Sequence, residues 1–86
     1  GSVEMDIEIN EKTRSFTVNP LQAAILYAFQ EEEVEEISIA DLSTQVGTSI
    51  DVIRQEIQFW ENHGILQQEE NGNLGTVLKH VWNKKQ

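Results

Sequence analysis

The residues that this sequence lacks exclude several classes of protein. Its 86 residues include no cysteine, so disulfide bonds and thiolate metal sites cannot form. No apolar run approaches the roughly 20 residues of a membrane-spanning helix, and no signal peptide is expected. Basic residues are also scarce, because 6 Lys and Arg face 15 Asp and Glu and give a formal net charge of −9. This acidity predicts good solubility and argues against a nucleic-acid backbone as the main partner; no membrane partner is expected either.

Residues that could carry catalysis or hold a metal ion are equally scarce. His63 and His80 are the only histidines, and no repeated ligand spacing surrounds them. His63 is expected in the last turn of a helix, where a cation suits the helix dipole, so a structural role is favoured. The acidic run Glu31–Glu36 is interpreted as a solvated loop, because a calcium loop needs spaced oxygen ligands and a glycine turn. We therefore expect no catalytic residue, no cofactor and no metal site.

The start of the chain predicts a β-hairpin at residues 3–18. Gly1-Ser2, before it, is interpreted as the remnant of a cleaved expression tag. Asn10–Thr13 is expected to turn the chain, and Arg14–Val18 to form the second strand. Apolar residues alternate with polar ones along the first strand, at Val3, Met5, Ile7 and Ile9. Because a hairpin alone is marginally stable in water, this one must pack on helices or join a larger sheet.

The most apolar stretch, Asn19–Gln30, predicts the central helix of a single domain. Asn19 is a suitable N-cap, Pro20 fits the first helical position, and Gln22 can complete a capping box. The apolar residues at helical spacing are Leu21, Ala24, Ile25, Ala28 and Phe29, and Leu26 and Tyr27 widen this stripe. A helix that is apolar over so much of its circumference is expected to be covered by neighbours on several sides.

Two further helices are predicted to form a helix-turn-helix. A capping signature at Ser38–Asp41 opens the first helix, and Gly47 fits the left-handed C-cap that ends it. Thr48 is predicted to cap the second helix, with Asp51 three residues later, and Gly64 is predicted to end it. The inward-facing positions are predicted at Ile39, Leu42 and Val46 in the first helix and at Ile50, Ile53, Ile57 and Trp60 in the second.

A two-stranded wing is predicted to follow. Asn71-Gly72 is a strong hairpin signal, and it lies between candidate strands at Ile65–Gln68 and Leu74–Trp82. Trp82 itself is left open as either a core residue or a partner-facing one.

The order of these elements predicts an α+β fold. It is a winged helix at residues 19–82, with a three-helix helix-turn-helix core and a C-terminal β wing, preceded by the N-terminal β-hairpin. A basic tail at residues 83–86 follows, and its Lys84 and Lys85 form a basic cluster with Lys79.

The second helix of the predicted helix-turn-helix does not have the composition of a DNA-recognition helix. Such a helix carries Arg, Lys, Asn or Gln outward, with Lys and Arg against the phosphates. Ser49–Gly64 contains one basic residue, Arg54. The acidic residues of this helix and of the wing tip are Asp51, Glu56, Glu61, Glu69 and Glu70. A DNA-binding winged-helix transcription regulator therefore remains the alternative hypothesis, supported by fold analogy alone.

Three segments carry a resemblance to a known family. They are FTVNPLQAAILYAFQ (Phe16–Gln30), ISIADLSTQVG (Ile37–Gly47) and IQFWENHGIL (Ile57–Leu66). The chain resembles the first winged-helix module of the cullin homology region, over roughly residues 5–68. Ordinary cullins typically have Ser-Thr-Phe-Gln where this chain has Asn-Pro-Leu-Gln at 19–22. The Pro-x-Gln-Ala version, together with the Trp and Gly at 60 and 64, is most similar to the cullin-like subunits of the anaphase-promoting complex.

The resemblance implies a non-catalytic scaffold role in a RING-type ubiquitin ligase. In that family the cullin-like subunit holds a RING subunit, which recruits a ubiquitin-conjugating enzyme. The implied partners are therefore the RING subunit, the conjugating enzyme through it, and other ligase subunits, with a location in the nucleus and cytoplasm. The lysine modified in ordinary cullins lies in a later winged helix, so no residue here is assigned that role. The 86-residue chain by itself is expected to be monomeric.

The hairpin is the predicted partner-binding element. In the family the RING partner contributes a strand to a sheet near this region, so the hairpin can form part of that sheet. Val3–Ile9 has an alternating apolar face and presents a backbone edge that another chain can extend. Carboxylates on its wet face are expected to discourage random pairing. The candidate partner-binding residues are Glu4, Asp6, Ile7 and Glu8.

Overall fold

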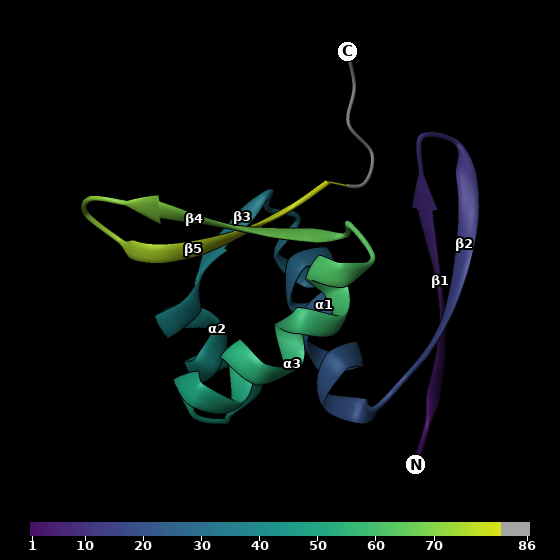
Figure 1. The fold of residues 1–86 in the computed structure, drawn as a ribbon, viewed down its shortest axis with the longest axis horizontal. Coiled ribbons are helices and arrows are strands. Elements are labelled where there is room, and N and C mark those ends of the chain that lie inside the picture. The colour runs from purple at the N-terminus through teal and green to yellow at the C-terminus, as the bar shows by residue number, and fades with distance from the viewer. Residues whose placement is uncertain (82–86) are drawn as a thin grey trace.

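A computed structural model describes residues 1–81, and it confirms the predicted α+β winged helix with an N-terminal hairpin (Figure 1). Trp82 and the basic tail at residues 83–86 lie outside the described residues. The elements in chain order are β1 (Val3–Ile9), β2 (Lys12–Val18), α1 (Pro20–Glu32), β3 (Glu36–Ser38), α2 (Ile39–Val46), α3 (Ile50–Asn62), β4 (Leu66–Asn71) and β5 (Gly75–His80). In residues 1–81 we find no helix with the length and apolarity needed to cross a membrane.

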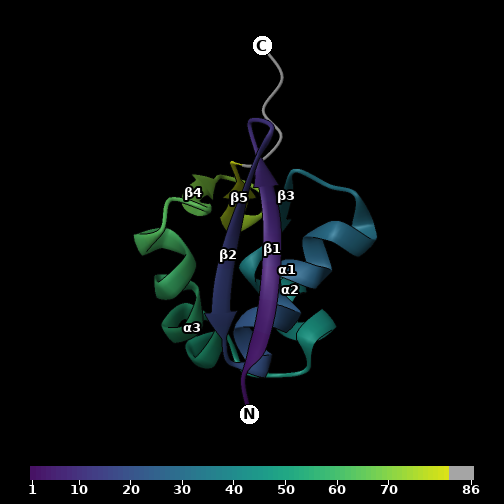
Figure 2. The same cartoon turned by 90° about the vertical axis from the view of Figure 1, so that its right-hand side faces the viewer.

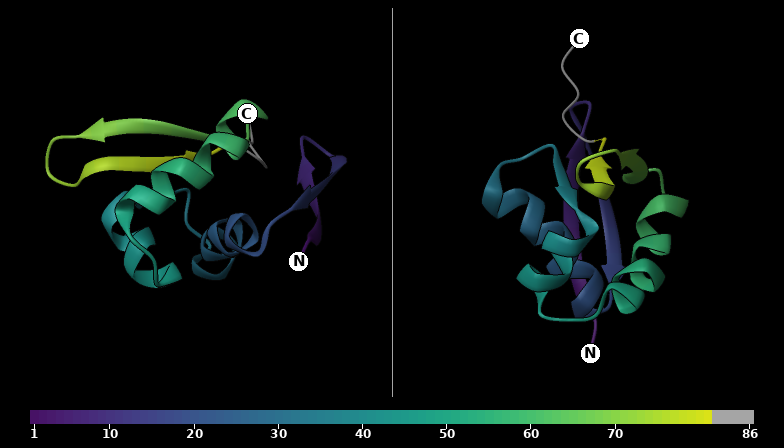
Figure 3. Two further views of the ribbon diagram at one scale, coloured as in Figure 1. Left: turned by 60° about the horizontal axis from the view of Figure 1, so that its bottom comes forward. Right: turned by 90° about the vertical axis from the view of Figure 1, so that its left-hand side faces the viewer.

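The hairpin lies on one side of the helices, and the tip of the wing extends to the opposite side (Figures 1 and 3). β1 and β2 pair as an antiparallel two-stranded sheet, with Met5 opposite Phe16. The turn occupies Asn10 and Glu11, both at positive φ (51° and 67°), as a two-residue type I′ hairpin turn requires. The predicted turn at residues 10–13 was therefore too long, because the left-handed conformations reverse the chain in two residues.

The N-terminus of α1 forms as predicted. The side chain of Asn19 accepts a hydrogen bond from the backbone amide of Gln22 (2.7 Å), and the Gln22 side chain accepts one from the Asn19 amide (3.1 Å). The helix runs two residues beyond Gln30 and ends where Glu33 adopts a left-handed φ of 53°. The apolar stripe is confirmed at Leu26, which is buried, but is wrong at Tyr27, which is 43% exposed.

The turn between α2 and α3 differs from its prediction by one residue. The side chain of Ser49, not Thr48, accepts the hydrogen bond of the first turn of α3, from the amide of Val52 (3.2 Å). Thr48 is instead used in the turn, because its amide donates to the carbonyl of Ser43 and its carbonyl accepts from the Ser43 hydroxyl. Ile50, a predicted core residue, is the first residue of α3 and is 39% exposed, so the buried stripe of the helix begins at Ile53.

The glycine stops are where the sequence predicted them. Gly47 has a φ of 85° after α2. Gly64 has a φ of 71° after α3, where the amide of Ile65 donates to the Trp60 carbonyl and that of Gly64 to the Glu61 carbonyl. These two bonds are the pattern of a Schellman motif, which satisfies the last carbonyls of the helix.

The wing is a three-stranded sheet with the order β3-β5-β4. β3, which the sequence did not predict, pairs Ile37 with Leu78. The acidic run is consequently only partly a loop, since it begins in α1 and ends in β3. The turn between β4 and β5 lies at residues 72–74, and the side chain of Asn71 accepts from the amides of Asn73 and Leu74. Such side-chain bonds explain why Asn marks the turn.

One hydrophobic core joins the hairpin to the helices and the wing. The indole of Trp60 is fully buried and donates a hydrogen bond to the carbonyl of Gln22 at the start of α1 (3.0 Å). The core residues predicted to pack around α1 are all in this cluster, with no solvent exposure: Ile25, Leu42, Ile53, Ile57 and Trp60.

Candidate protein-interaction surface

The two faces of β1 have opposite roles. Glu4, Asp6 and Glu8 are exposed on the face of β1 that the sequence predicted to be solvated. Ile7, the fourth predicted partner residue, is 2% exposed and belongs to the core. Its side chain is therefore mainly a core contact and reaches the surface only at the floor of a groove beside β1, whereas the acidic side chains of β1 are exposed.

The backbone direction along β1 follows from the register of the hairpin. The two-residue turn makes Ile9 and Lys12 a hydrogen-bonded pair. Hydrogen-bonded and non-hydrogen-bonded pairs alternate along antiparallel strands, so Ile7 also directs its amide and carbonyl toward β2. The backbone groups of Asp6 and Glu8 point the other way. The residues whose carboxylates are exposed thus also present their peptide groups at the outer edge of β1.

This outer edge pairs with no strand among residues 1–81. The sheet contains β1 and β2 alone, and β1 lies on the side of α1 while β2 lies on the side of α3 (Figure 2). An unpaired edge of seven residues is long enough for another chain to add a strand. One side chain on it is already engaged, because the hydroxyl of Ser15 donates to the carboxylate of Asp6 (2.6 Å) across the hairpin.

A groove, here called the β1 groove, runs along this edge toward the end of α1. Its volume is about 460 Å³. Ile7, Phe29 and Val34 supply apolar surface to it, while carboxylates come from both of its sides. Its polar lining residues are Asp6, Glu8, Gln30, Glu33 and His80. Of the residues that line this groove, the sequence indicated only those of β1. The others come close to β1 through tertiary packing, which no local sequence pattern predicts.

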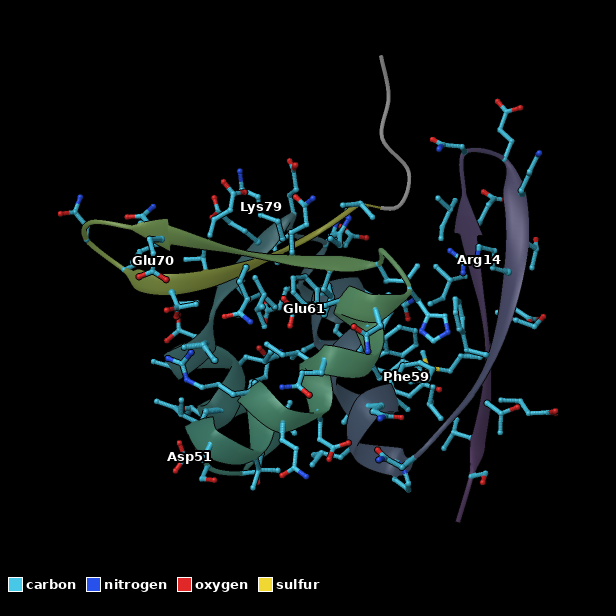
Figure 4. The ribbon with its side chains drawn as sticks, in the orientation of Figure 1. Arg14, Asp51, Phe59, Glu61, Glu70 and Lys79 are labelled. Atoms are coloured by element: carbon cyan, nitrogen blue, oxygen red, sulfur yellow. The ribbon has the colours of Figure 1, made fainter. Side chains whose placement is uncertain are left out.

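The hairpin is fastened to α3 by aromatic and cationic contacts. The guanidinium of Arg14 donates to the carbonyl of His63 (3.1 Å) and lies 5.0 Å from the centre of the Phe16 ring. Phe16 packs edge-on against Trp60 (5.2 Å between ring centres) and Phe59 (6.2 Å). Figure 4 shows Arg14 on the hairpin facing the end of α3 that carries Phe59. These contacts fasten the β2 side of the hairpin to α3.

The outward face of α3 is acidic and partly engaged in hydrogen bonds. Glu56 accepts from the side chain of Asn19 (2.8 Å), and Glu61 accepts from the side chain of Gln68 (3.1 Å). Asp51 lies in the first turn of the helix, and Figure 4 shows it at the opposite end of α3 from Glu61. This distribution of charge does not favour a DNA duplex, whose phosphates would meet carboxylates on the recognition helix.

The described residues contain no arrangement suited to metal binding. Within residues 1–81, no group of three or more His, Asp or Glu side chains is placed so that it could hold a metal ion. The sequence predicted His63 in the last turn of the helix, but α3 ends at Asn62 and His63 is its C-cap. The ring Nδ1 of His63 donates to the carbonyl of Phe59 (2.8 Å), a structural contact at the end of the helix. The hydrogen bond to Glu69 raises the pKa of Lys79. Because the pKa of the Lys79 ammonium is raised, the pair is intact at neutral pH, and on the alkaline side its contribution is lost as the pH rises through that raised pKa.

Comparisons with known proteins complete the description of the surface. No protein-family model matches the chain. It is 30% identical to anaphase-promoting complex subunit 2 of Arabidopsis thaliana over 78 residues, which are 91% of this chain and 9% of that protein. It is 31% identical to the subunit 2 of Homo sapiens over 77 residues (90% and 9%), and 29% identical to that of Dictyostelium discoideum over 73 residues (79% and 8%). The chain thus spans less than a tenth of the length of each of these relatives.

Proposed function

Because the chain is homologous to a segment of anaphase-promoting complex subunit 2, a cullin-like subunit, we propose that it is a scaffold module of a cullin-type RING ubiquitin ligase. In this proposal it performs no chemistry itself. It helps to hold the RING subunit and so to position the ubiquitin-conjugating enzyme. The observation that carries the proposal is a similarity that extends over about nine-tenths of the chain.

The geometry of the hairpin supports a specific way of holding the RING subunit. We propose that a strand of that subunit adds to the outer edge of β1, where Asp6 and Glu8 direct their peptide groups. Main-chain hydrogen bonds supply affinity in such strand addition, and alternate side chains supply specificity. On the inner side of the added strand, side chains would enter the β1 groove beside Phe29 and Val34.

The test uses proline at two positions that face each other in the hairpin. Asp6 and Ser15 are cross-strand partners, and their amides point to the outer edges of β1 and β2 respectively. Proline removes an amide donor. Asp6→Pro and Ser15→Pro both abolish the same side-chain hydrogen bond and both leave the bonds between β1 and β2 intact. The two variants therefore differ in which outer edge loses a donor.

The measurement is retention of the RING subunit by a full-length subunit 2 that carries this segment, together with ubiquitin transfer by the assembled complex. Asp6→Pro should reduce both, whereas Ser15→Pro should keep both near the level of the parent. Circular dichroism of the 86-residue chain verifies that each variant is folded. Full retention by a folded Asp6→Pro variant would contradict strand addition at β1, and a larger loss for Ser15→Pro would place the contact on β2.

A further inference from the structure

A second groove, here called the wing groove, lies between the end of α1, β3, α2 and the tip of the wing. Its volume is about 490 Å³. It shares only Val34 with the β1 groove, so it forms a separate surface. Figure 3 (right) looks toward the wing tip that overhangs this region. The homology does not explain this groove, and the proposed strand addition does not use it.

The apolar part of the wing groove includes an unusually exposed leucine. Leu74 lies in the turn of the wing, is 56% exposed and does not belong to the core cluster. Val34 and Ile37 form apolar surface across from it. Single exposed apolar residues are common. This one, however, borders a groove that already has an apolar floor, so a side chain inserted there would gain contacts on both sides.

The polar part of the groove is acidic. Glu32, Glu36 and Asp41 line it from α1, β3 and α2. The salt bridge found within residues 1–81 joins Lys79 to Glu69 (3.1 Å), so these three carboxylates have no ion-pair partner in that part of the chain. Lys79 attracts Glu36 electrostatically, but its ammonium is held by Glu69. The groove thus keeps an excess of negative charge around an apolar centre.

We propose that the wing groove binds a short basic segment of a partner protein, in which an apolar side chain is flanked by Lys or Arg. The apolar side chain would pack between Leu74 and Ile37, and the flanking cations would meet the carboxylates of Glu32, Glu36 and Asp41. Charge complementarity favours this occupant, because anionic segments and nucleic acids would be repelled by the same carboxylates. The inference does not depend on the RING proposal.

The experiment titrates the ¹⁵N-labelled 86-residue chain with a defined peptide and records amide chemical shifts. The probe is an acetylated and amidated lysine-leucine-lysine-leucine-lysine peptide, and the control peptide has glutamate in place of lysine. Shift changes should concentrate in residues 34–41 and 72–75, and they should be absent with the control peptide. Added salt should weaken binding because the flanking contacts are electrostatic.

Matched variants separate the groove from general acidity. One variant neutralises the three carboxylates of the groove, as Glu32→Gln, Glu36→Gln and Asp41→Asn. Its affinity for the peptide should be lower by about fivefold or more, because close charge pairs are lost. Neutralising Asp51, Glu56 and Glu61 on α3 in the same way removes equal charge and should change affinity by less than about twofold, because surface charges at a distance are screened. Leu74→Ser, at an exposed turn, should weaken binding without affecting the fold.

Four outcomes would overturn the inference. Chemical-shift changes scattered over the whole acidic surface would show non-specific attraction. A loss of affinity in the α3 variant equal to that in the groove variant would show the same. An unchanged affinity of Leu74→Ser for the peptide would show that the peptide makes no apolar contact with Leu74. Shifts in residues 72–75 that change on dilution of the protein alone would show instead that a second copy of the chain occupies the groove.

Discussion

The hairpin and the helical core use apolar residues very differently. In the core, α1 buries side chains in several directions and its N-terminal groups are satisfied by Asn19 and Gln22. The hairpin buries one face only, through Met5 and Phe16 and their neighbours, and its other face is exposed. The comparison shows a division of roles within one small domain. The helices bury side chains on several sides, whereas the hairpin depends on them for its packing and keeps an unpaired edge, which is where we propose that a partner strand adds.

The largest loss of stability is expected from a substitution in the helical core. Ile57 is fully buried on α3, so Ile57→Ala should lower the free energy of unfolding by about 2–5 kcal/mol. Ile9, at the partly buried end of β1, is the matched hairpin position, and Ile9→Ala should cost less than half as much. Urea denaturation of both variants gives the comparison. Equal losses would mean that the hairpin is as tightly integrated as the helices.

A smaller effect is expected at the start of α3. Ser49→Ala removes the acceptor for the amide of Val52 and should destabilise the domain by about 1 kcal/mol. Thr48→Ala is the control, because Thr48 takes part in the turn through its backbone groups. Thermal denaturation followed by circular dichroism measures both. If Thr48→Ala were the more harmful substitution, α3 would begin one residue earlier than the structure shows.

The smallest effect should be found at the contact that joins the two regions. Arg14→Ala removes the hydrogen bond to the His63 carbonyl and the cation–π contact with Phe16. Because these groups are at the surface, we expect a loss of about 0.5–1 kcal/mol. Amide hydrogen exchange should quicken in the hairpin and stay unchanged in α1. Faster exchange in α1 would show that the hairpin does not open independently of the core.

Much of the fold was predictable from the sequence because its signals are local. The cap at Asn19, the glycine stops at 47 and 64, and the alternation along β1 each depend on a few neighbouring residues. β3 was missed because it has three residues and owes its existence to β5, about forty positions away. Periodicity also does not show where neighbouring elements stop covering a helix, so Tyr27 on α1 and Ile50 at the start of α3 were predicted to be buried but are exposed.

The interaction surface was predictable only in part. The alternation of apolar and polar residues along β1 identified the exposed carboxylates. Ile7, which was predicted to bind a partner, is instead in the core, and its peptide groups point toward β2. Nothing in the sequence marked the two grooves that meet at Val34. They exist because the end of α1, where Glu33 turns the chain, lies next to β1 on one side and next to α2 and the wing on the other.

The position of Trp60 gives the molecule a built-in optical reporter. Its indole is sealed in the core, hydrogen-bonded to Gln22 of α1, and lies against the edge of Phe16 of the hairpin. Fluorescence of a buried indole is blue-shifted and moves to the red when water reaches the ring. In a Trp82→Phe variant, the emission of Trp60 alone would therefore change first when the hairpin detaches and again when the core unfolds. The order in which the two regions unfold could be followed without any added label.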